Sequence, residues 1–458
     1  MGLVKIIGGS EFKTYFAGIS TGTANVANDI AVNAVVNEII AAVRSEGDAA
    51  VRRYATQLFH AGFEKSVPEK FEVPLDLAKE AWENLTAAEP ELAAALIFAA
   101  DNLRRFAALQ KGQFRDFEEE IAPGLFAGQR IIPVEKAAIY TPGGRFPLIS
   151  SALMGLIPAR VAGVGELALA SPPGTNGLPD QRILAVAHLA GVDRIFALGG
   201  AQAIAALALG TETVPRVDLI AGPGNKYVVA AKRMLFGEVG IDLLPGPTDV
   251  LIITDTKAGA ASAEEAANLI AEAADLIAAD MLAQAEHDPD ARARALVPDR
   301  EMAELIKRAL EKHLGRLPTA ETARASLEAG GLIVVYQSRD EAVSIANEIA
   351  PEHLELHIFS PDEWIPDLRN YGSLFIGPLA AEVLGDYSAG INHTLPTSTS
   401  ARFSGGLSVR HFLKTVTTLR CAASKDHAKA LQAAETIARA EGLAAHAESA
   451  ALRRDSKP

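Results

Sequence analysis

The chain has 458 residues, of which 49% are hydrophobic and 22% are charged, and its formal net charge is −14. This length exceeds one ordinary core and predicts two or more domains, while the acidic balance argues against a nucleic-acid partner. The longest apolar runs, such as AALIFAA at 94–100, are too short to span a membrane. Since the N-terminus lacks a signal-peptide pattern, we expect a cytoplasmic protein. The single cysteine, Cys421, excludes an intramolecular disulfide and a thiolate zinc site.

Residues 25–110 carry apolar side chains at spacings of three and four and predict helices throughout, with Gly47 marking a break. From residue 131 short apolar runs alternate with helical stretches, which is the βαβ pattern of a parallel sheet covered by helices on both faces. The runs are KAAIYTP (136–142), GELALASPP (165–173), DRIFALGG (193–200) and VDLIAGPG (217–224), and the helical stretches are 150–163, 181–190, 201–209 and 226–236.

A second set of apolar runs follows, again separated by helical stretches, and the Ala-rich segment 258–280 predicts one long amphipathic helix. The expected fold is α/β, with two Rossmann-like, doubly wound units that have parallel sheets, plus a small helical C-terminal domain. The second runs are DVLIITD (249–255), GLIVVYQS (331–338), LELHIFS (354–360) and GSLFIG (372–377). The predicted division is an N-terminal extension (1–29), one α/β unit with metal and acid–base residues (30–135 and 249–400), another α/β unit that binds NAD (136–248) and the C-terminal domain (401–458).

Three glycine-containing loops each follow a predicted strand and precede a predicted helix: YTPGG at 140–144, GGAQA at 199–203 and AGPGN at 221–225. Glycine there allows backbone N–H groups to approach a phosphate at a helix N-terminus. Any one of these loops alone is explained by an ordinary tight turn, and none fits the G-x-G-x-x-G fingerprint. Three in succession along one sheet edge favour a nucleotide or another polar ligand.

Several pairs of polar residues are candidates for chemistry, although a solvated surface explains each pair taken alone. Gln284 and His287 share a face near the end of a predicted helix, because they are three residues apart. Taken together, some of these residues form a nitrogen and oxygen donor set that suits Zn²⁺ in a chain with one cysteine. The other pairs are Glu352 with His353 in a loop before a strand, Asp386 with His393 in a loop punctuated by Gly and Pro, and Glu441 with His446 on the C-terminal helix; the donor set is Gln284, His287, Asp386 and His446.

The chain resembles the histidinol dehydrogenases from about residue 30 to 450. The motifs that carry the resemblance occur in the family's order: YTPGG, GGAQAIAALALGTETVPRVDLIAGPGN, AQAEHDPD, APEHLEL, GDYSAGINHTLPT and AEGLAAH. The resemblance implies a zinc-containing, NAD-dependent homodimer that oxidises a primary alcohol through the aldehyde to the carboxylate. It also implies that the C-terminal segment reaches into the partner's active site.

The resemblance further assigns a role to each matching residue. His353 would take the alcohol proton while hydride leaves for NAD⁺, and Glu352 would activate the water that attacks the aldehyde. The remaining assignments are zinc at Gln284, His287, Asp386 and His446; NAD at Tyr140, Gln202 and Asn225; and substrate at Thr248, Gln284, His287, His353, Asp386, His393, Glu441 and His446.

Some positions depart from the family pattern and leave the substrate open. Thr248 and Asp249 replace the usual Ser-Glu, while Arg145 and the segment 405–415 resemble catabolic relatives that oxidise a sulfonated propanediol. Histidinol is cationic, so an arginine in the site would repel it and would favour an anionic alcohol such as 2,3-dihydroxypropane-1-sulfonate. Arg145 in contact with the NAD pyrophosphate is an equal alternative. A non-catalytic scaffold that binds metal or nucleotide is a hypothesis of another class, against which the full set of proposed ligands and proton-transfer residues argues.

Overall fold

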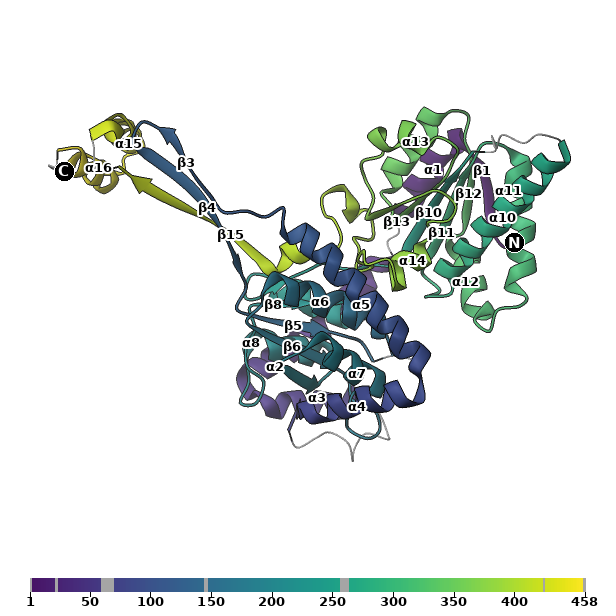
Figure 1. Ribbon diagram of the computed structural model, residues 1–458, viewed down its shortest axis with the longest axis horizontal. Helices are drawn as coiled ribbons and strands as arrows, with labels where there is room; N and C mark the ends of the chain where they lie inside the picture. Colours follow the sequence, from purple (N-terminus) through teal and green to yellow (C-terminus); the bar gives the residue numbers. More distant parts are fainter. Residues whose placement is uncertain are drawn as a thin grey trace.

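The structure is a computed structural model that describes residues 2–20, 24–58, 70–143, 147–255, 263–422 and 425–455. Figure 1 shows two α/β units and a long arm that carries the C-terminus away from both of them. Within the described residues, no helix is both long enough and apolar enough to cross a membrane. Arg145 and the start of the Ala-rich segment 258–280 lie outside the described residues.

The first α/β unit is built on a six-stranded sheet with the order β2-β7-β6-β5-β8-β9, parallel except where β2 pairs with β7. Its central strands are buried on both faces, which explains why they read as continuous apolar runs. The strands are β2 (Glu72–Val73), β5 (Lys136–Tyr140), β6 (Glu166–Ser171), β7 (Arg194–Ala197), β8 (Leu219–Ala221) and β9 (Gly240–Ile241).

Two layers of helices cover this sheet. Helices α4, α5, α6 and α7 share one core with Ala137 and Ile139 of β5, while α2, α3, α8 and α9 share the other core with Ala138 and Tyr140. The bounds are α2 (Ala24–Glu46), α3 (Asp48–Leu58), α4 (Leu75–Ala88), α5 (Pro90–Lys111), α6 (Ile149–Ala162), α7 (Gln181–Ala190), α8 (Gly200–Leu209) and α9 (Lys226–Leu235).

The N-terminal helices belong to a different unit from the one predicted, because the predicted division grouped 30–135 with 249–400. Helix α2 packs on α8 and α9, and α4 packs on α7, so these helices belong with 136–248. Their apolar stripes require a covered face but do not specify which sheet covers it. The predicted break is confirmed, because α2 ends at Glu46 and α3 begins at Asp48 on either side of Gly47.

The second α/β unit has a fully parallel sheet with the order β1-β12-β11-β10-β13-β14. Strand β1 and helix α1 belong to this unit, so the predicted extension 1–29 is partly built into it. One face packs on α10, α11 and α12, and the other packs on α1 and α13. The strands are β1 (Lys5–Gly8), β10 (Asp249–Thr254), β11 (Arg292–Val297), β12 (Leu332–Val335), β13 (His353–His357) and β14 (Ser373–Ile376). The helices are α1 (Gly9–Ser20), α10 (Ala263–Ala285), α11 (Arg300–Leu314), α12 (Ala320–Gly330), α13 (Arg339–Ile349) and α14 (Glu382–Tyr387), with 3-10 turns η1 (Pro361–Glu363), η2 (Ile365–Asp367) and η3 (Ser400–Arg402).

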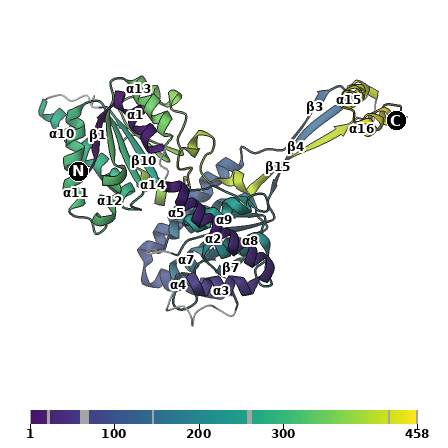
Figure 2. The same ribbon diagram turned by 180° about the vertical axis from the view of Figure 1, so that it is seen from behind.

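The arm combines two distant parts of the sequence, as Figure 2 shows from behind. Its antiparallel sheet has the order β15-β4-β3 and ends in two helices that pack on each other. The expected helices of the C-terminal domain are present, and the strand β15 adds to them a pairing with β4 that the sequence did not predict. The elements are β3 (Phe117–Ala122), β4 (Leu125–Pro133), η4 (Val409–Phe412), β15 (Leu413–Cys421), η5 (Lys425–His427), α15 (Ala428–Ala440) and α16 (Ala444–Asp455).

Candidate active site and metal centre

A cavity of about 190 Å³ lies where the two α/β units meet. The first unit contributes Ser151 at the start of α6 and Pro223 after β8, both beyond the carboxyl ends of its strands. The second unit contributes the amino ends of its strands, since Thr248 precedes β10 and His353 begins β13. The cavity is thus lined by opposite edges of the two sheets. Of the predicted site residues it contains Thr248, His287, Glu352, His353, Asp386 and His393.

His353 is 3% exposed and is surrounded by carboxylates. Its Nδ1 lies 3.7 Å from Glu382 Oε1 and 4.0 Å from Glu352 Oε2, and its Nε2 lies 3.7 Å from Asp386 Oδ1. Burial lowers the pKa of His353, but these three carboxylates outweigh burial and hold the pKa well above its ordinary value. The imidazole is therefore protonated unless another cation neutralises the acidic groups beside it.

Glu352 is buried next to His353, and burial raises its pKa to about 7. Its Oε2 accepts hydrogen bonds from the Thr248 hydroxyl and from the backbone N–H of Asp249, at 2.5 and 3.1 Å. Asp249 in turn accepts the Glu352 backbone N–H and pairs with Arg294 at 3.3 Å. The two positions that depart from the family pattern, Thr248 and Asp249, thus hold the proposed proton-transfer carboxylate in place.

Three of the four predicted metal ligands, Gln284, His287 and Asp386, lie together in this chain. Glu382, which was not predicted, lies beside them. Donor atoms of His287, Glu382 and Asp386 are all within 4.8 Å of one another. Gln284 is buried at the end of α10, and its Nε2 donates to Thr248 Oγ1 at 2.6 Å. The cluster therefore offers imidazole, carboxylate and amide oxygen donors, which suit Zn²⁺.

The orientation of the Gln284 amide tests whether these residues fit a metal. With its nitrogen bonded to Thr248, its oxygen faces Glu382 Oε1 at 2.7 Å, an unfavourable contact between two oxygens. Turning the amide over would satisfy Glu382, but the single hydroxyl proton of Thr248 would then have to serve both Gln284 and Glu352. A cation with the Gln284 oxygen as a ligand would remove this conflict, so the residues fit a metal.

His393 lies on another wall of the cavity with its Nε2 3.3 Å from Ser151 Oγ. Burial lowers the pKa of His393 to about 4, so its ring is neutral near pH 7. The cavity therefore contains one histidine held in its charged form and one held neutral. A neutral imidazole can exchange hydrogen bonds with a polar substrate without adding charge.

The predicted NAD-contacting residues lie together on the carboxyl edge of the first sheet. Tyr140 ends β5, and its hydroxyl accepts the backbone N–H of Gly200 at 3.1 Å. Asn225 caps α9 through Oδ1, which accepts from the backbone N–H groups of Tyr227 and Val228. Gln202 is 1% exposed, and neither atom of its amide has a hydrogen-bond partner in the described part of the chain. A buried amide with free donor and acceptor is consistent with a polar ligand at this edge.

The AGPGN turn on this edge is shaped by a close backbone approach and by a buried ion pair. Gly222 has φ +114°, and a Cβ there would lie 2.0 Å from the Tyr140 carbonyl oxygen. Lys232 and Asp242, whose side chains are each 1% exposed, form an ion pair beneath the turn. Lys232 donates to the Gly222 carbonyl and Asp242 accepts the Gly222 N–H, so the pair fixes the turn from both sides.

Two predicted substrate or metal residues, Glu441 and His446, lie far from the cavity of this chain. Glu441 caps the end of α15, and His446 lies on α16, so they do not share one helix as the sequence suggested. Both side chains are exposed at the far end of the arm (Figure 1). A single chain therefore does not bring them to His353.

Proteins of one known family share the sequence and the fold of this chain. The family model described as Histidinol dehydrogenase matches residues 23–454. The histidinol dehydrogenase of Methylococcus capsulatus is 43% identical over 93% of this chain and 92% of its own length, and that of Thermus thermophilus is 44% identical over 93% and 95%. The chain belongs to the histidinol dehydrogenase family. A crystal structure of histidinol dehydrogenase from Elizabethkingia anophelis superposes with a TM-score of 0.82 at 33% identity, covering 92% of this chain and 91% of that one.

The match to the histidinol dehydrogenase family covers the first α/β unit, nearly all of the arm and the second α/β unit except β1 and α1. Sequence reasoning nevertheless missed Glu382, which is 3% exposed and lies between His353 and Gln284. The signal was available, since Glu382 and Asp386 are four residues apart on α14 and therefore share a face. Ser151, the partner of His393, carries no comparable signal because it begins an apolar helix.

Proposed function

We propose that the protein oxidises a small polar primary alcohol, L-histidinol, through the aldehyde to the carboxylate, L-histidine, with zinc and NAD. The observation that carries the proposal is the buried Glu352–His353 pair beside the donor cluster of His287, Glu382 and Asp386 in one cavity. A base and a Lewis acid at the alcohol oxygen both promote loss of hydride from its carbon. The reaction would consume two NAD⁺ and one water for each alcohol.

Gln284, His287 and Asp386 would hold the zinc, with His446 of a second chain as the proposed fourth ligand. When bound, zinc would polarise the substrate oxygen and lower the pKa of its proton. Its positive charge beside Asp386 would also offset the carboxylates that keep His353 protonated. His353 could then accept the alcohol proton at Nε2 while hydride leaves the carbon for NAD⁺.

The second oxidation needs a nucleophile that the first does not. Glu352, with its pKa raised to about 7 by burial, is suited to remove a proton from water as the water attacks the aldehyde carbon. A second hydride then leaves the hydrated carbon for another NAD⁺. Because the two steps have different needs, Glu352→Gln should slow aldehyde oxidation more than alcohol oxidation.

The charge of the cavity favours a cationic substrate. Its lining includes Glu352, Glu382 and Asp386, and no lysine or arginine among the described residues. A sulfonate would meet like charge there, whereas the ammonium and imidazole groups of histidinol would be attracted. This weighs for histidinol over the anionic alcohol.

We further propose a homodimer in which the two chains share their active sites. Large apolar side chains remain exposed along the arm, which is the expected surface of a segment that packs on another chain. Among them, Ile121 is 64%, Leu419 69% and Ile437 59% exposed. Packing of the arm on a second copy would bury these groups and carry Glu441 and His446 to the partner's cavity.

The test is NADH formation by the zinc-loaded protein with L-histidinol and, separately, with 2,3-dihydroxypropane-1-sulfonate. We expect efficient turnover of histidinol at two NADH per alcohol and little turnover of the sulfonate. A reversed preference would overturn the histidinol assignment. Absence of turnover with both alcohols, in folded protein that holds zinc, would favour the non-catalytic scaffold.

A further inference from the structure

Strand β13 places a row of ionisable side chains on a buried face. Leu354 and Leu356 point into the core shared with α1 and α13, so the alternate residues, His353, Glu355 and His357, face the opposite side. Helix α10 covers that side and contributes Asp280 and Gln284, which are four residues apart and share a face. His287 follows two residues after the helix ends at Ala285. The proposed active site uses His353, Gln284 and His287, whereas the remaining residues on these two faces have no assigned role.

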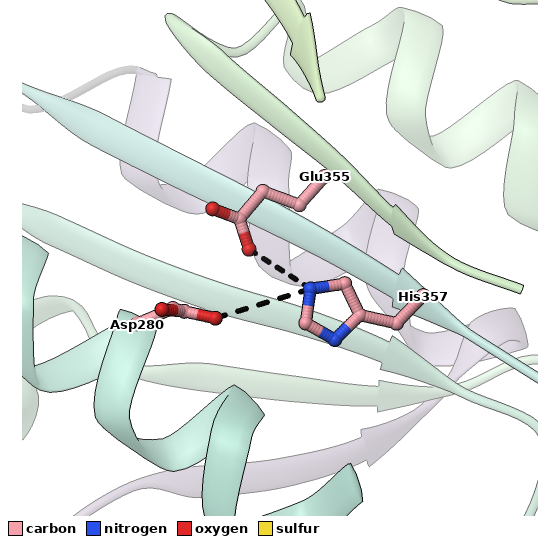
Figure 3. A group of neighbouring side chains, drawn as sticks. All are labelled: Asp280, Glu355 and His357. Atoms are coloured by element: carbon pink, nitrogen blue, oxygen red, sulfur yellow. Dashed lines mark ion pairs between the residues drawn. The ribbon is translucent and has the colours of Figure 1, made fainter. Parts of the chain in front are cut away.

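Asp280, Glu355 and His357 form this second cluster (Figure 3). The Nε2 atom of His357 lies 3.2 Å from Glu355 Oε2 and 3.9 Å from Asp280 Oδ2. Figure 3 shows both carboxylates directed at this same ring nitrogen. One potential donor atom from each residue lies within 4.8 Å of those from the other two. The arrangement converges on one point between α10 and β13.

The cluster is buried, and three of its polar side-chain atoms have no hydrogen-bond partner among the described residues. Glu355 is 0% and His357 6% exposed, while the Asp280 side chain is 16% exposed and forms the solvent edge. These atoms are the two ring nitrogens of His357 and the Oε2 of Glu355. Buried polar atoms in native proteins are almost always satisfied. A ligand at the point of convergence would satisfy Glu355 Oε2 and His357 Nε2.

The charge balance identifies the class of ligand. Two buried carboxylates face one imidazole, and no lysine or arginine pairs with either of them in the described ranges. The cluster thus lacks positive charge, and a divalent cation would neutralise both carboxylates.

We infer that Asp280, Glu355 and His357 bind a divalent transition-metal ion of the Zn²⁺ class at a second site, separate from the metal beside His353. An imidazole ligand disfavours Ca²⁺ and Mg²⁺, which prefer all-oxygen sites. Tetrahedral Zn²⁺ with bonds of about 2.1 Å separates its donors by roughly 3.4 Å. The observed 3.2 and 3.9 Å lie within a small side-chain adjustment of that value. The edge at Asp280 leaves room for water as a fourth ligand.

This metal ties α10 to β13 and thereby positions the proposed active site. Asp280 lies about one helical turn before Gln284, and Glu355 lies two residues after His353 on the same strand face. Glu355 Oε1 also accepts the backbone N–H of Glu382 at 2.7 Å, which holds the start of α14. The inference does not depend on turnover, because metal binding is measured directly.

The test counts Zn²⁺ bound to the chelator-treated full-length protein by equilibrium dialysis and elemental analysis. Wild type should bind two equivalents per chain, His357→Leu one, His287→Ala one, and the double variant close to none. Glu355→Gln should repeat the His357→Leu result with a smaller change of shape. Asp275→Asn is the matched control, since this exposed carboxylate of α10 pairs with Lys312 and His313 and should leave two equivalents.

Thermal unfolding gives a second readout that separates the two metals. In His287→Ala only the cluster remains, and Zn²⁺ at about a hundred times its dissociation constant should raise the melting temperature by roughly 3 °C. That rise should vanish when His357→Leu is added. A single equivalent in folded wild type, lost in His287→Ala and kept in His357→Leu, would overturn the second site and leave the proposed active-site metal intact. A single equivalent in folded wild type that is lost in His357→Leu and kept in His287→Ala would overturn the active-site metal instead.

Discussion

Replacing Thr248 with valine removes the hydroxyl that donates to Glu352 Oε2 and keeps the volume of the side chain nearly unchanged. That hydrogen bond stabilises the ionised carboxylate, so it lowers the pKa of Glu352 against the larger effect of burial. A hydrogen bond to a charged group contributes about 1.5–3 kcal/mol, and one pKa unit corresponds to about 1.4 kcal/mol. The pKa of Glu352, about 7 in the wild type, should therefore rise by about one to two units.

The assay is the pH dependence of kcat/KM for aldehyde oxidation, in which ionised Glu352 would activate the water. The acid limb of the profile should move to higher pH by about one to two units in Thr248→Val, with the plateau at high pH largely retained. Thr248→Ser keeps the hydroxyl and should leave the limb in place. An unmoved limb in folded, zinc-loaded Thr248→Val would refute the assignment of Glu352 as the group that activates water.

His353→Asn should keep its zinc by elemental analysis but lose about 10²–10⁴-fold in the rate of alcohol oxidation; near-normal turnover would remove His353 from the mechanism. Mixing inactive His446→Ala with inactive His353→Asn protein should restore some activity after subunit exchange, because one hybrid cavity then has both groups, whereas no recovery would count against a shared site. Lys232→Met leaves Asp242 buried without its partner and should reduce the free energy of unfolding by about 3–5 kcal/mol in urea titrations. Adding Asp242→Asn to Lys232→Met should recover part of the lost free energy of unfolding. A loss under about 1 kcal/mol in Lys232→Met would mean that the pair is not buried in solution.

The sequence by itself determined most local elements that have a buried face. The strands predicted after residue 131 and the helices between them are present close to their predicted bounds, because continuous apolar runs and 3.6-residue periods reflect burial directly. Strand β11 is buried but was not predicted, since arginines interrupt its apolar residues. The family motifs also predicted six residues that line the cavity, from Thr248 to His393. These motifs are short, and each lies at the end of a strand or helix whose position the local pattern specifies.

Only the tertiary structure decided which remote segments lie together. The stripes of α2–α5 are equally compatible with either sheet, and β3 has no fully buried residue and hence no periodic signal, although it pairs with β4 over its length. Glu355 and His357 look like half of an ordinary alternating strand until α10 is packed over them with Asp280. An alternating pattern shows that two faces differ, but the partner that covers each face comes from hundreds of residues of packing elsewhere in the chain.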